Sequence, residues 1–362
     1  MGYIILFVLT AARVQARLND LEEFLRDDYK LAHPPKQRDW RTYEEQWARR
    51  VRQVMRDLDP LVQQACAFSI ERGPGPPHAL TLPQRVTLLL LKTLYAQSNR
   101  RMAGMLVAFS LLSGLDVSYK TIERLYSDPE VAIALENLHT LMLRRRGLRS
   151  TDATGDGTGY TLSITQHYAS TVERLRENAK ENPPPSEGTG TPSGSDVPAK
   201  KVHRFVYAFR LLDLRTRLYV AFGTSLRSER AAYDAALRQL VGSGVEVTSI
   251  RLDRLYSTPA DAARFRGAQV YLLPKTNSHL AIQREWLGAM RSFVENTTDF
   301  LEQYYQREQS EAGFSADKRM LGWSIAQRRE DRIDRAQVCL STWHNLLNLY
   351  GPDHSLPTNP SG

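Results

Sequence analysis

The chain has 362 residues, 42% of them hydrophobic and 24% charged, which excludes a disordered or fibrous protein and suits a globular one of two or three domains. Its 48 Lys and Arg outnumber its 40 Asp and Glu, and the formal net charge of +8 favours polyanionic partners, nucleic acid before anionic membrane. Cys66 and Cys339 stand far apart in the chain, so a disulfide framework and a cysteine zinc site are both excluded.

An apolar run of ten residues, Tyr3 to Ala12, lies near the N-terminus. It is too short to span a bilayer and lacks the basic flank of a signal peptide. We therefore expect no membrane partner and a reduced, cytoplasmic protein, associated with the nucleoid if its partner is DNA. A membrane-associated protein is an alternative that rests on this run alone.

Residues 1–147 are expected to be all helical, because charges are dense from Arg17 to Arg56 and apolar residues recur at helical spacing. A Pro/Gly-rich break at residues 73–77 divides this region. After it the sequence predicts a helix from Pro83 to Ala96, with the proline in the first turn, and a second from Asn99 to Leu112.

A third helix is predicted to begin after Ser118, a suitable N-cap, with Gly114 in the turn before it. This helix-turn-helix, near residues 99–127, would carry Lys120 and Arg124 on its last helix. Such a helix can enter the major groove, so residues 1–147 form a candidate DNA-binding region with these two cations as contacts. Many helical bundles share a Gly turn and surface cations without binding DNA.

From residue 148 the pattern changes to strands. They are expected at 148–153, 158–168, 204–212, 218–224, 247–252 and 269–273, with helices at 228–241 and 259–266 and helical structure from about Leu280. The Pro-, Gly- and Ser-rich stretch at about 170–201 is expected to be a disordered loop, and residues 351–362 a flexible tail. The prediction for 148–350 is an α/β domain, a mixed sheet flanked by helices.

Three carboxylates are candidates for chemistry. Asp152 ends the first predicted strand, Asp253 ends the strand at 247–252, and Glu311 lies in the helical region that follows. An acid at the end of a buried strand is held rigidly at the sheet edge, where sites form in open α/β sheets. A single Asp at such a position is more often a turn residue or an N-cap.

Four residues around Glu311 are predicted to share one face of a single helix. At about 100° per residue, Tyr304, Arg307, Glu311 and Lys318 fall within one narrow stripe. The alternative is a solvent-exposed face with an Arg307–Glu311 ion pair worth only about 0.3 kcal/mol. The functional interpretation is a catalytic stripe in which a metal-binding acid is flanked by cations that contact DNA phosphates.

These residues resemble a known family. The spacing Tyr304-x2-Arg307-x3-Glu311-x6-Lys318 matches in full the Y-x2-R-x3-E-x6-K signature of prokaryotic insertion-sequence DDE transposases. Other stretches are similar in order: Asp152-Ala-Thr-Gly155, Leu252-Asp-Arg-Leu-Tyr-Ser257, Leu273-Pro-Lys-Thr-Asn277, Phe314-Ser-Ala-Asp-Lys-Arg-Met-Leu-Gly322 and Trp343-His-Asn-Leu-Leu347. Together they cover about residues 148–350.

The resemblance implies an RNase H-like catalytic core that cuts and transfers DNA strands with two Mg²⁺ or Mn²⁺ ions. It makes Asp152, Asp253 and Glu311 the catalytic and metal-binding triad, and Tyr304, Arg307 and Lys318 DNA-binding residues. It also implies element-end and target DNA as partners and a homodimer in the DNA complex. Hard carboxylate oxygens suit Mg²⁺, and two metals can activate the attacking oxygen and stabilise the leaving one.

Asp156 is a competing carboxylate. We interpret the run Gly155–Gly159 around it as a turn, and the context of Asp152 resembles the family, so Asp152 is preferred. Two alternatives in function also remain. A DNA-binding protein derived from a transposase would keep the charge and the helix-turn-helix without catalysis, and an RNase H-like nuclease would cut without strand transfer.

Overall fold

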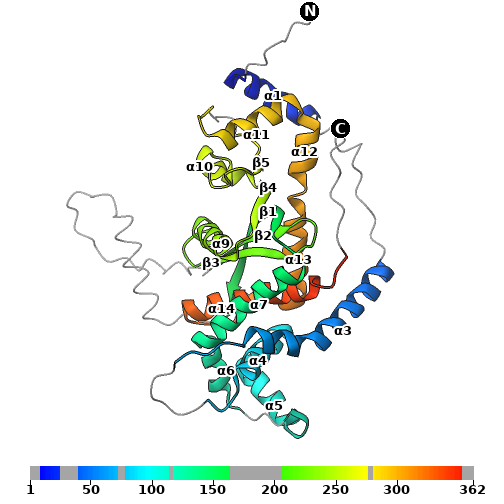
Figure 1. Ribbon diagram of the computed structural model, residues 1–362, viewed down its shortest axis with the longest axis vertical. Helices are drawn as coiled ribbons and strands as arrows, with labels where there is room; N and C mark the ends of the chain where they lie inside the picture. Colours follow the sequence, from blue (N-terminus) through cyan, green and yellow to red (C-terminus); the bar gives the residue numbers. More distant parts are fainter. Residues whose placement is uncertain are drawn as a thin grey trace, which may run out of the picture.

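The structure, a computed structural model, describes residues 9–24, 40–71, 78–113, 117–163, 205–275 and 280–352 (Figure 1). The predicted loop at 170–201, the Pro/Gly break at 73–77 and the tail beyond Pro352 lie outside the described residues. None of the helices in the described part is long and apolar enough to cross a membrane.

The N-terminal part is helical as predicted, with elements at α1 (Ala11–Phe24), α3 (Trp40–Ala65), α4 (Leu82–Leu94), α5 (Asn99–Ser113), α6 (Tyr119–Leu125) and α7 (Pro129–Arg145). Local sequence explains where several begin. Thr81 and Gln84 form a reciprocal capping box at α4, Ser118 caps α6 as predicted, and Asp128 caps α7 ahead of Pro129. Helix α1 lies apart from the others and packs on α11 (Arg284–Glu295), where Val14 joins a core that includes Trp286.

The sheet is mixed, which confirms the predicted α/β class. Its order is β3 (Tyr219–Ser225), β2 (Phe205–Asp213), β1 (Ser150–Leu162), β4 (Glu246–Leu252) and β5 (Gln269–Tyr271), and β6 (Ser324–Ile325) pairs with the end of β1. The three strands β1, β2 and β3 pair antiparallel, whereas β4 and β6 pair parallel to β1, and β5 parallel to β4.

Helices cover both faces of the sheet (Figure 1). Helix α9 (Glu229–Ser243) packs on one face, and α10 (Pro259–Ala262) and α11 extend that layer. Helices α12 (Thr297–Tyr305), α13 (Glu308–Leu321) and α14 (Glu330–Asn348) lie on the other face. Helix α14 also packs against α3, α4 and α7, so one hydrophobic core joins the N-terminal helices to the sheet.

Strand β1 corrects the sequence analysis. Residues 148–153 and 158–168 were expected to be two strands with a turn at Gly155–Gly159, but 150–162 is one continuous strand. Its glycines are required by packing rather than by a turn. A Cβ on Gly159 would lie 1.5 Å from the Phe205 ring, and one on Gly157 would lie 2.3 Å from the Glu229 carboxyl carbon.

Alternation along β1 separates two kinds of side chain. Asp152, Thr154, Asp156, Thr158 and Tyr160 share one face of the strand, because successive side chains point to opposite sides of a sheet. Hydroxyl contacts show which helix covers this polar face: Thr154 and Thr158 both bond to side chains of α13. The opposite face carries Ala153 and the glycines and packs towards α9.

Strand β3 forms one edge of the sheet, and side chains from neighbouring helices bond to its outer backbone groups. Asn345 of α14 accepts from the Tyr219 N–H (2.7 Å) and donates to the Tyr219 carbonyl (2.9 Å). Gln239 of α9 accepts from the Phe222 N–H (2.6 Å). The His139 ring of α7 lies 3.2 Å from the Val220 carbonyl oxygen.

Candidate active site

The register of the sheet places Asp156 next to Asp253. Strands β1 and β4 run parallel with Gly155 opposite Leu252, so the residues that follow each of them are neighbours on adjacent strands about 4.8 Å apart. Asp253 directly follows β4 and caps the short 3-10 turn Arg254–Tyr256, its carboxylate accepting from the Arg254 N–H at 2.5 Å. Both aspartates are partly exposed.

Glu311 reaches the same place from helix α13. The helix is fastened to β1 at two points, by Ser310 Oγ to Thr154 Oγ1 (3.1 Å) and by Lys318 Nζ to Thr158 Oγ1 (2.7 Å). Asp156 lies between these two anchors on the same face of β1. Glu311 follows the first anchor directly and is exposed, so its carboxylate faces solvent beside the strand.

Electrostatic coupling joins the three acids. The pKa of Asp156 is raised to about 6, mainly by burial. The charges of Glu311 and Asp253 contribute to the rise, whereas the Gly157 N–H and Arg307 oppose it. Arg307 Nη1 also lies 3.0 Å from Glu311 Oε1. The site is therefore a concentration of negative charge with one guanidinium at its border, which favours a divalent cation.

Asp152 is not part of this group. It pairs in register with Ser249 and lies four residues before Asp156, about 13 Å along the strand. Its Oδ1 accepts hydrogen bonds from Ser249 Oγ (2.6 Å) and Thr248 Oγ1 (3.0 Å). The expectation that Asp152 lies beside Asp253 is wrong because the glycine run that was interpreted as a turn continues the strand, which carries the active end further along.

A signal for Asp156 was present in the sequence. Polar residues alternate with small ones from Asp152 to Thr158, which is the period of a strand with one polar face. Counting that alternation through the glycines would have extended β1 and placed Asp156 level with Asp253.

The stripe around Glu311 does not lie on one helix. Tyr304 ends α12, whereas Glu311 and Lys318 belong to α13, and Arg307 lies at the junction. Backbone bonds there reach back three residues rather than four, including Arg307 N–H to Tyr304 O and Ser310 N–H to Arg307 O. The continuous helix predicted from the spacing is therefore broken between residues 305 and 308.

The break gives Tyr304 and Arg307 different surroundings. Tyr304 is 3% exposed, and burial raises its pKa to about 12. A ring so deeply buried is not available to contact DNA, which is the role that the resemblance implies for it. The Arg307 guanidinium lies 5.5 Å from the centre of that ring, and this cation–π contact helps to fix the position of the guanidinium. Tyr304 thus positions Arg307, which in turn contacts Glu311.

Lys318 is held at the far end of the same face. Besides Thr158, its ammonium group lies 5.1 Å from the Tyr160 ring and 5.2 Å from the ring of Trp323, an exposed tryptophan. Partial burial lowers the pKa of Lys318, with the nearby positive charge of Arg210 as the second cause. A phosphate near Asp156 would restore the favourable surroundings of a charged ammonium.

A buried polar network fixes α13 from behind. Arg210 of β2 and Asp317 of α13 form an ion pair at 3.2 Å, and Tyr219 donates to the same carboxylate at 2.8 Å. The other oxygen of Asp317 lies 2.7 Å from His344 Nδ1 on α14. These residues place the helix that carries Glu311, and the sequence analysis did not single out Arg210 or Asp317.

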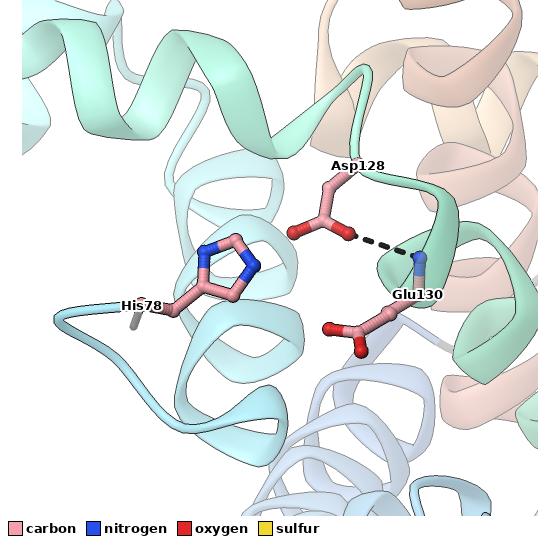
Figure 2. Close-up of side chains that lie close together, drawn as sticks. All are labelled: His78, Asp128 and Glu130. Carbon is pink, nitrogen blue, oxygen red and sulfur yellow. Dashed lines mark hydrogen bonds between the residues drawn. The ribbon is translucent and has the colours of Figure 1, made fainter. Parts of the chain in front are cut away.

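A second acidic group lies far from this site, in the N-terminal helices. Figure 2 shows His78, Asp128 and Glu130, whose ligand atoms all lie within 4.8 Å of one another, closer than the three acids near α13. Arg85 explains the cluster: its side chain is 2% exposed and forms ion pairs with both carboxylates. Asp128 also caps α7 through the Glu130 N–H at 2.9 Å. Arg85 balances one of the two negative charges, and the Asp128 carboxylate is also engaged by the cap of α7. We therefore interpret the group as a structural ion-pair cluster.

The predicted DNA-contacting residues of the N-terminal region lie on α6, which has seven residues. Lys120 and Arg124 are both exposed, and Lys120 Nζ lies 3.2 Å from Glu123 Oε2. The Tyr119 ring lies 5.4 Å from Lys120 Nζ and 5.2 Å from the guanidinium of Arg100 on α5. This end of the helices is basic and partly aromatic; the turn at 114–116 lies outside the described residues.

Comparison with known proteins adds one strong match. No family model matches the chain. It is 40% identical, over 335 residues, to a protein of Archaeoglobus fulgidus named "Probable transposase for insertion sequence element ISA1214". The aligned region covers 91% of this chain and 92% of that protein, so the similarity extends over both the N-terminal helices and the sheet.

Proposed function

The chain belongs to the family of insertion-sequence transposases, and we propose that it is a DDE transposase whose catalytic acids are Asp156, Asp253 and Glu311. The observation that carries this assignment is geometric: the register sets Asp156 beside Asp253, and α13, which carries Glu311, is fastened to β1 on either side of Asp156. We further propose that the mixed sheet is an RNase H-like core and that residues 1–147 bind the ends of the element.

The donor set fits divalent metal ions. Three carboxylates offer hard oxygen ligands. Burial is the main cause of the raised pKa of Asp156, and the negative charges of Glu311 and Asp253, which a cation would neutralise, add to it. Two Mg²⁺ or Mn²⁺ ions, when bound, activate the attacking oxygen and stabilise the leaving one. Asp156, Asp253 and Glu311 would hold them at the open side of the sheet.

The neighbouring cations act on the DNA. Arg307 carries a guanidinium suited to phosphate, positioned by the buried Tyr304 ring and by Glu311. Lys318 of α13 bonds to Thr158, which lies two residues after Asp156 on β1, and there it can neutralise an adjacent phosphate. We propose that both cations hold the scissile strand in place, and that Lys120 and Arg124 contact the duplex from α6 in a homodimeric complex.

Two aspartates on one strand provide a matched test. Asp156→Asn, Asp253→Asn and Glu311→Gln should each abolish Mg²⁺-dependent nicking of element-end DNA, whereas Asp152→Asn should nick at the wild-type rate. Binding in a gel-shift assay without metal should persist or tighten slightly in the first three, because each removes a charge that repels phosphate. Loss of nicking in Asp152→Asn with retention in Asp156→Asn would reverse the assignment.

The same assay separates the alternatives in function. Lys120→Ala and Arg124→Ala should weaken binding and reduce its salt dependence by a slope of about one per lost phosphate contact, while nicking at saturating DNA survives. Wild-type protein that binds but never nicks with Mg²⁺ or Mn²⁺ would identify a non-catalytic DNA-binding protein. Nicking without joining to a target duplex would identify a nuclease.

A further inference from the structure

An arginine-lined hollow lies along helix α3, away from the three acids. It has a volume of about 580 Å³ and is lined by Arg49, Arg50, Arg52 and Arg56 together with two glutamines of α3 and the C-terminal residues Tyr350 and Pro352. No acidic side chain stands among these lining residues, and none occurs in α3 between Gln46 and Arg56. The hollow is thus strongly cationic.

Helical geometry places three of these arginines together. At about 100° per residue, Arg49, Arg52 and Arg56 fall within about 60° of one another around α3, and all three are exposed. They span about 10 Å along the helix axis. Figure 1 shows α3 extending away from the rest of the molecule, which leaves this face accessible to a large partner.

The acids near the stripe already have partners. Glu45 and Asp59 lie before and after it on the same side of α3. Glu45 pairs with Arg41 at 3.3 Å, and Asp59 accepts a hydrogen bond from Gln63 at 3.4 Å. Asp57 follows Arg56 and accepts hydrogen bonds from Tyr350 and Gln53, and the Arg145 guanidinium lies 3.4 Å from the same oxygen. Hydrogen bonds from Tyr350 and Gln53 lower the pKa of Asp57. Asp57 therefore anchors the end of α14 and of α7 to α3, and it does not neutralise the exposed stripe.

We propose that this hollow binds the phosphodiester backbone of duplex DNA, independently of base sequence, at a place separate from both α6 and the catalytic acids. The inference rests on the proposed function, since it makes the element's own DNA the partner. Guanidinium forks match phosphate geometry, and B-DNA presents about one charge per 1.7 Å of its axis, so a 10 Å stripe faces several phosphates.

Chain connectivity limits how far this contact lies from the chemistry. Arg145 at the end of α7 is eleven residues before Asp156, a span of at most about 36 Å. One turn of B-DNA measures about 34–36 Å. Arg145 contacts Asp57, which follows the stripe, and the stripe itself adds about 10 Å. A single duplex that lies against the arginine stripe can therefore reach the acids within about two helical turns. An anionic membrane presents the same kind of charge, and the vesicle assay below distinguishes it from DNA.

The test compares two sets of three arginines. Arg49→Gln/Arg52→Gln/Arg56→Gln removes the stripe, and Arg238→Gln/Arg266→Gln/Arg291→Gln removes the same charge from exposed positions on α9, after α10 and on α11. Fluorescence anisotropy with a random-sequence duplex, in EDTA across a range of KCl concentrations, gives the salt dependence. The stripe variant should lose a slope of about three and the control variant much less.

Several results would overturn the proposal. One is an unchanged slope in the stripe variant when thermal unfolding shows that it is folded; another is an equal loss in the control variant. Binding to phosphatidylserine vesicles that depends on the stripe, with DNA binding unchanged, would assign the surface to membranes. Hydroxyl-radical footprints on element-end DNA should lose protection within about two helical turns of the cut, and an unchanged footprint would also count against the proposal.

The outcome is independent of whether the three acids cut DNA, because binding is measured without divalent metal. If the stripe variant binds weakly but nicks saturating DNA at the wild-type rate, both proposals stand. If neither protein nicks while the slope still falls by about three, the catalytic assignment fails and the DNA-binding surface remains.

Discussion

The ion pair between Arg210 and Asp317 offers a measurable link between the buried network and catalysis. Both side chains are almost fully buried, 1% and 2% exposed, and their charged atoms lie 3.2 Å apart. Asp317→Asn preserves the shape of the side chain but removes its charge. Tyr219 and His344, which also contact the carboxylate, would keep partners of similar geometry.

The Asp317→Asn change should lower the free energy of unfolding substantially, because it leaves the buried Arg210 guanidinium without a counter-charge. Breaking one partner of a buried ion pair typically costs about 3–5 kcal/mol. A matched surface pair is available in Asp234 and Arg264, whose charged atoms lie 2.6 Å apart with side chains 34% and 36% exposed. Asp234→Asn should cost less than about 1 kcal/mol, since exposed pairs contribute little.

Urea unfolding of both variants tests the difference, and nicking assays in the absence of urea test its consequence. Asp317→Asn should also nick more slowly than its folded fraction explains, because the pair fixes the helix that carries Glu311. Equal free energies of unfolding for Asp317→Asn and Asp234→Asn would refute the reasoning. A destabilised variant with normal nicking per folded molecule would restrict the pair to a role in folding.

Three further predictions use other parts of the fold. Gly223→Ala should destabilise the protein by several kcal/mol, because the new Cβ would lie 2.2 Å from the carbonyl oxygen of Ala232 in α9. Gly104→Ala, whose Cβ would have nothing within 4 Å, should stabilise α5 by up to about 1 kcal/mol. Thermal unfolding of the two variants compares these effects. Burial lowers the pKa of His139 to about 4, so the unfolded chain binds more protons than the folded chain between pH 4 and 6.5. The free energy of unfolding should therefore fall by up to about 3 kcal/mol as the pH decreases through that range. Unfolding curves of His139→Gln should lack this effect. The pKa of Asp156 is raised to about 6, and a metal ion competes with the proton for this carboxylate. The Mg²⁺ concentration needed for half-maximal nicking should therefore rise below about pH 6. A constant concentration from pH 5 to 8 would contradict the role of Asp156 as a metal ligand.

The sequence pattern predicted the strands whose residues have the composition typical of a buried strand. The strand at 247–252 and the aspartate that follows it were visible in the sequence, because the β-branched residues Val247, Thr248 and Ile250 favour a strand there. The strands at 204–212 and 218–224 matched β2 and β3 to within one residue, because most residues of both antiparallel strands are buried and apolar. The end of α9 was predicted at Gly242, whereas the helix continues to Ser243 and ends at Gly244, a glycine with positive φ.

The strand through Asp156 could not be recognised from local propensity. Glycine weakens an isolated strand, and a Gly-Asp-Gly-Thr-Gly run is typical of turns. Here the absence of a Cβ is required by Phe205 and Glu229, which arrive from β2 and α9. That requirement depends on contacts between residues about fifty or more positions apart in the chain, so it appears only when the fold is assembled.

The break between α12 and α13 has a similar origin. The Tyr304–Lys318 spacing is compatible with one helix, and nothing in it marks a junction. In the structure the end of α12 is tied to β4, where Arg251 donates to the Gln303 carbonyl at 3.1 Å, while the start of α13 is tied to β1 by Ser310. The end of α12 and the start of α13 are thus fixed to different strands of a twisted sheet, and two helical segments satisfy both contacts where one straight helix would not.

The side chains that bond to β3 protect the sheet from pairing with other molecules. An edge strand with free N–H and C=O groups is a template for a strand of another chain, and natural sheets block such edges to avoid aggregation. Asn345 occupies both backbone groups of Tyr219, and Gln239 occupies the Phe222 N–H. The opposite edge, β5, is only three residues long. Asn345, in the Trp343–Leu347 segment, therefore blocks backbone pairing at this edge and disfavours self-association through the sheet.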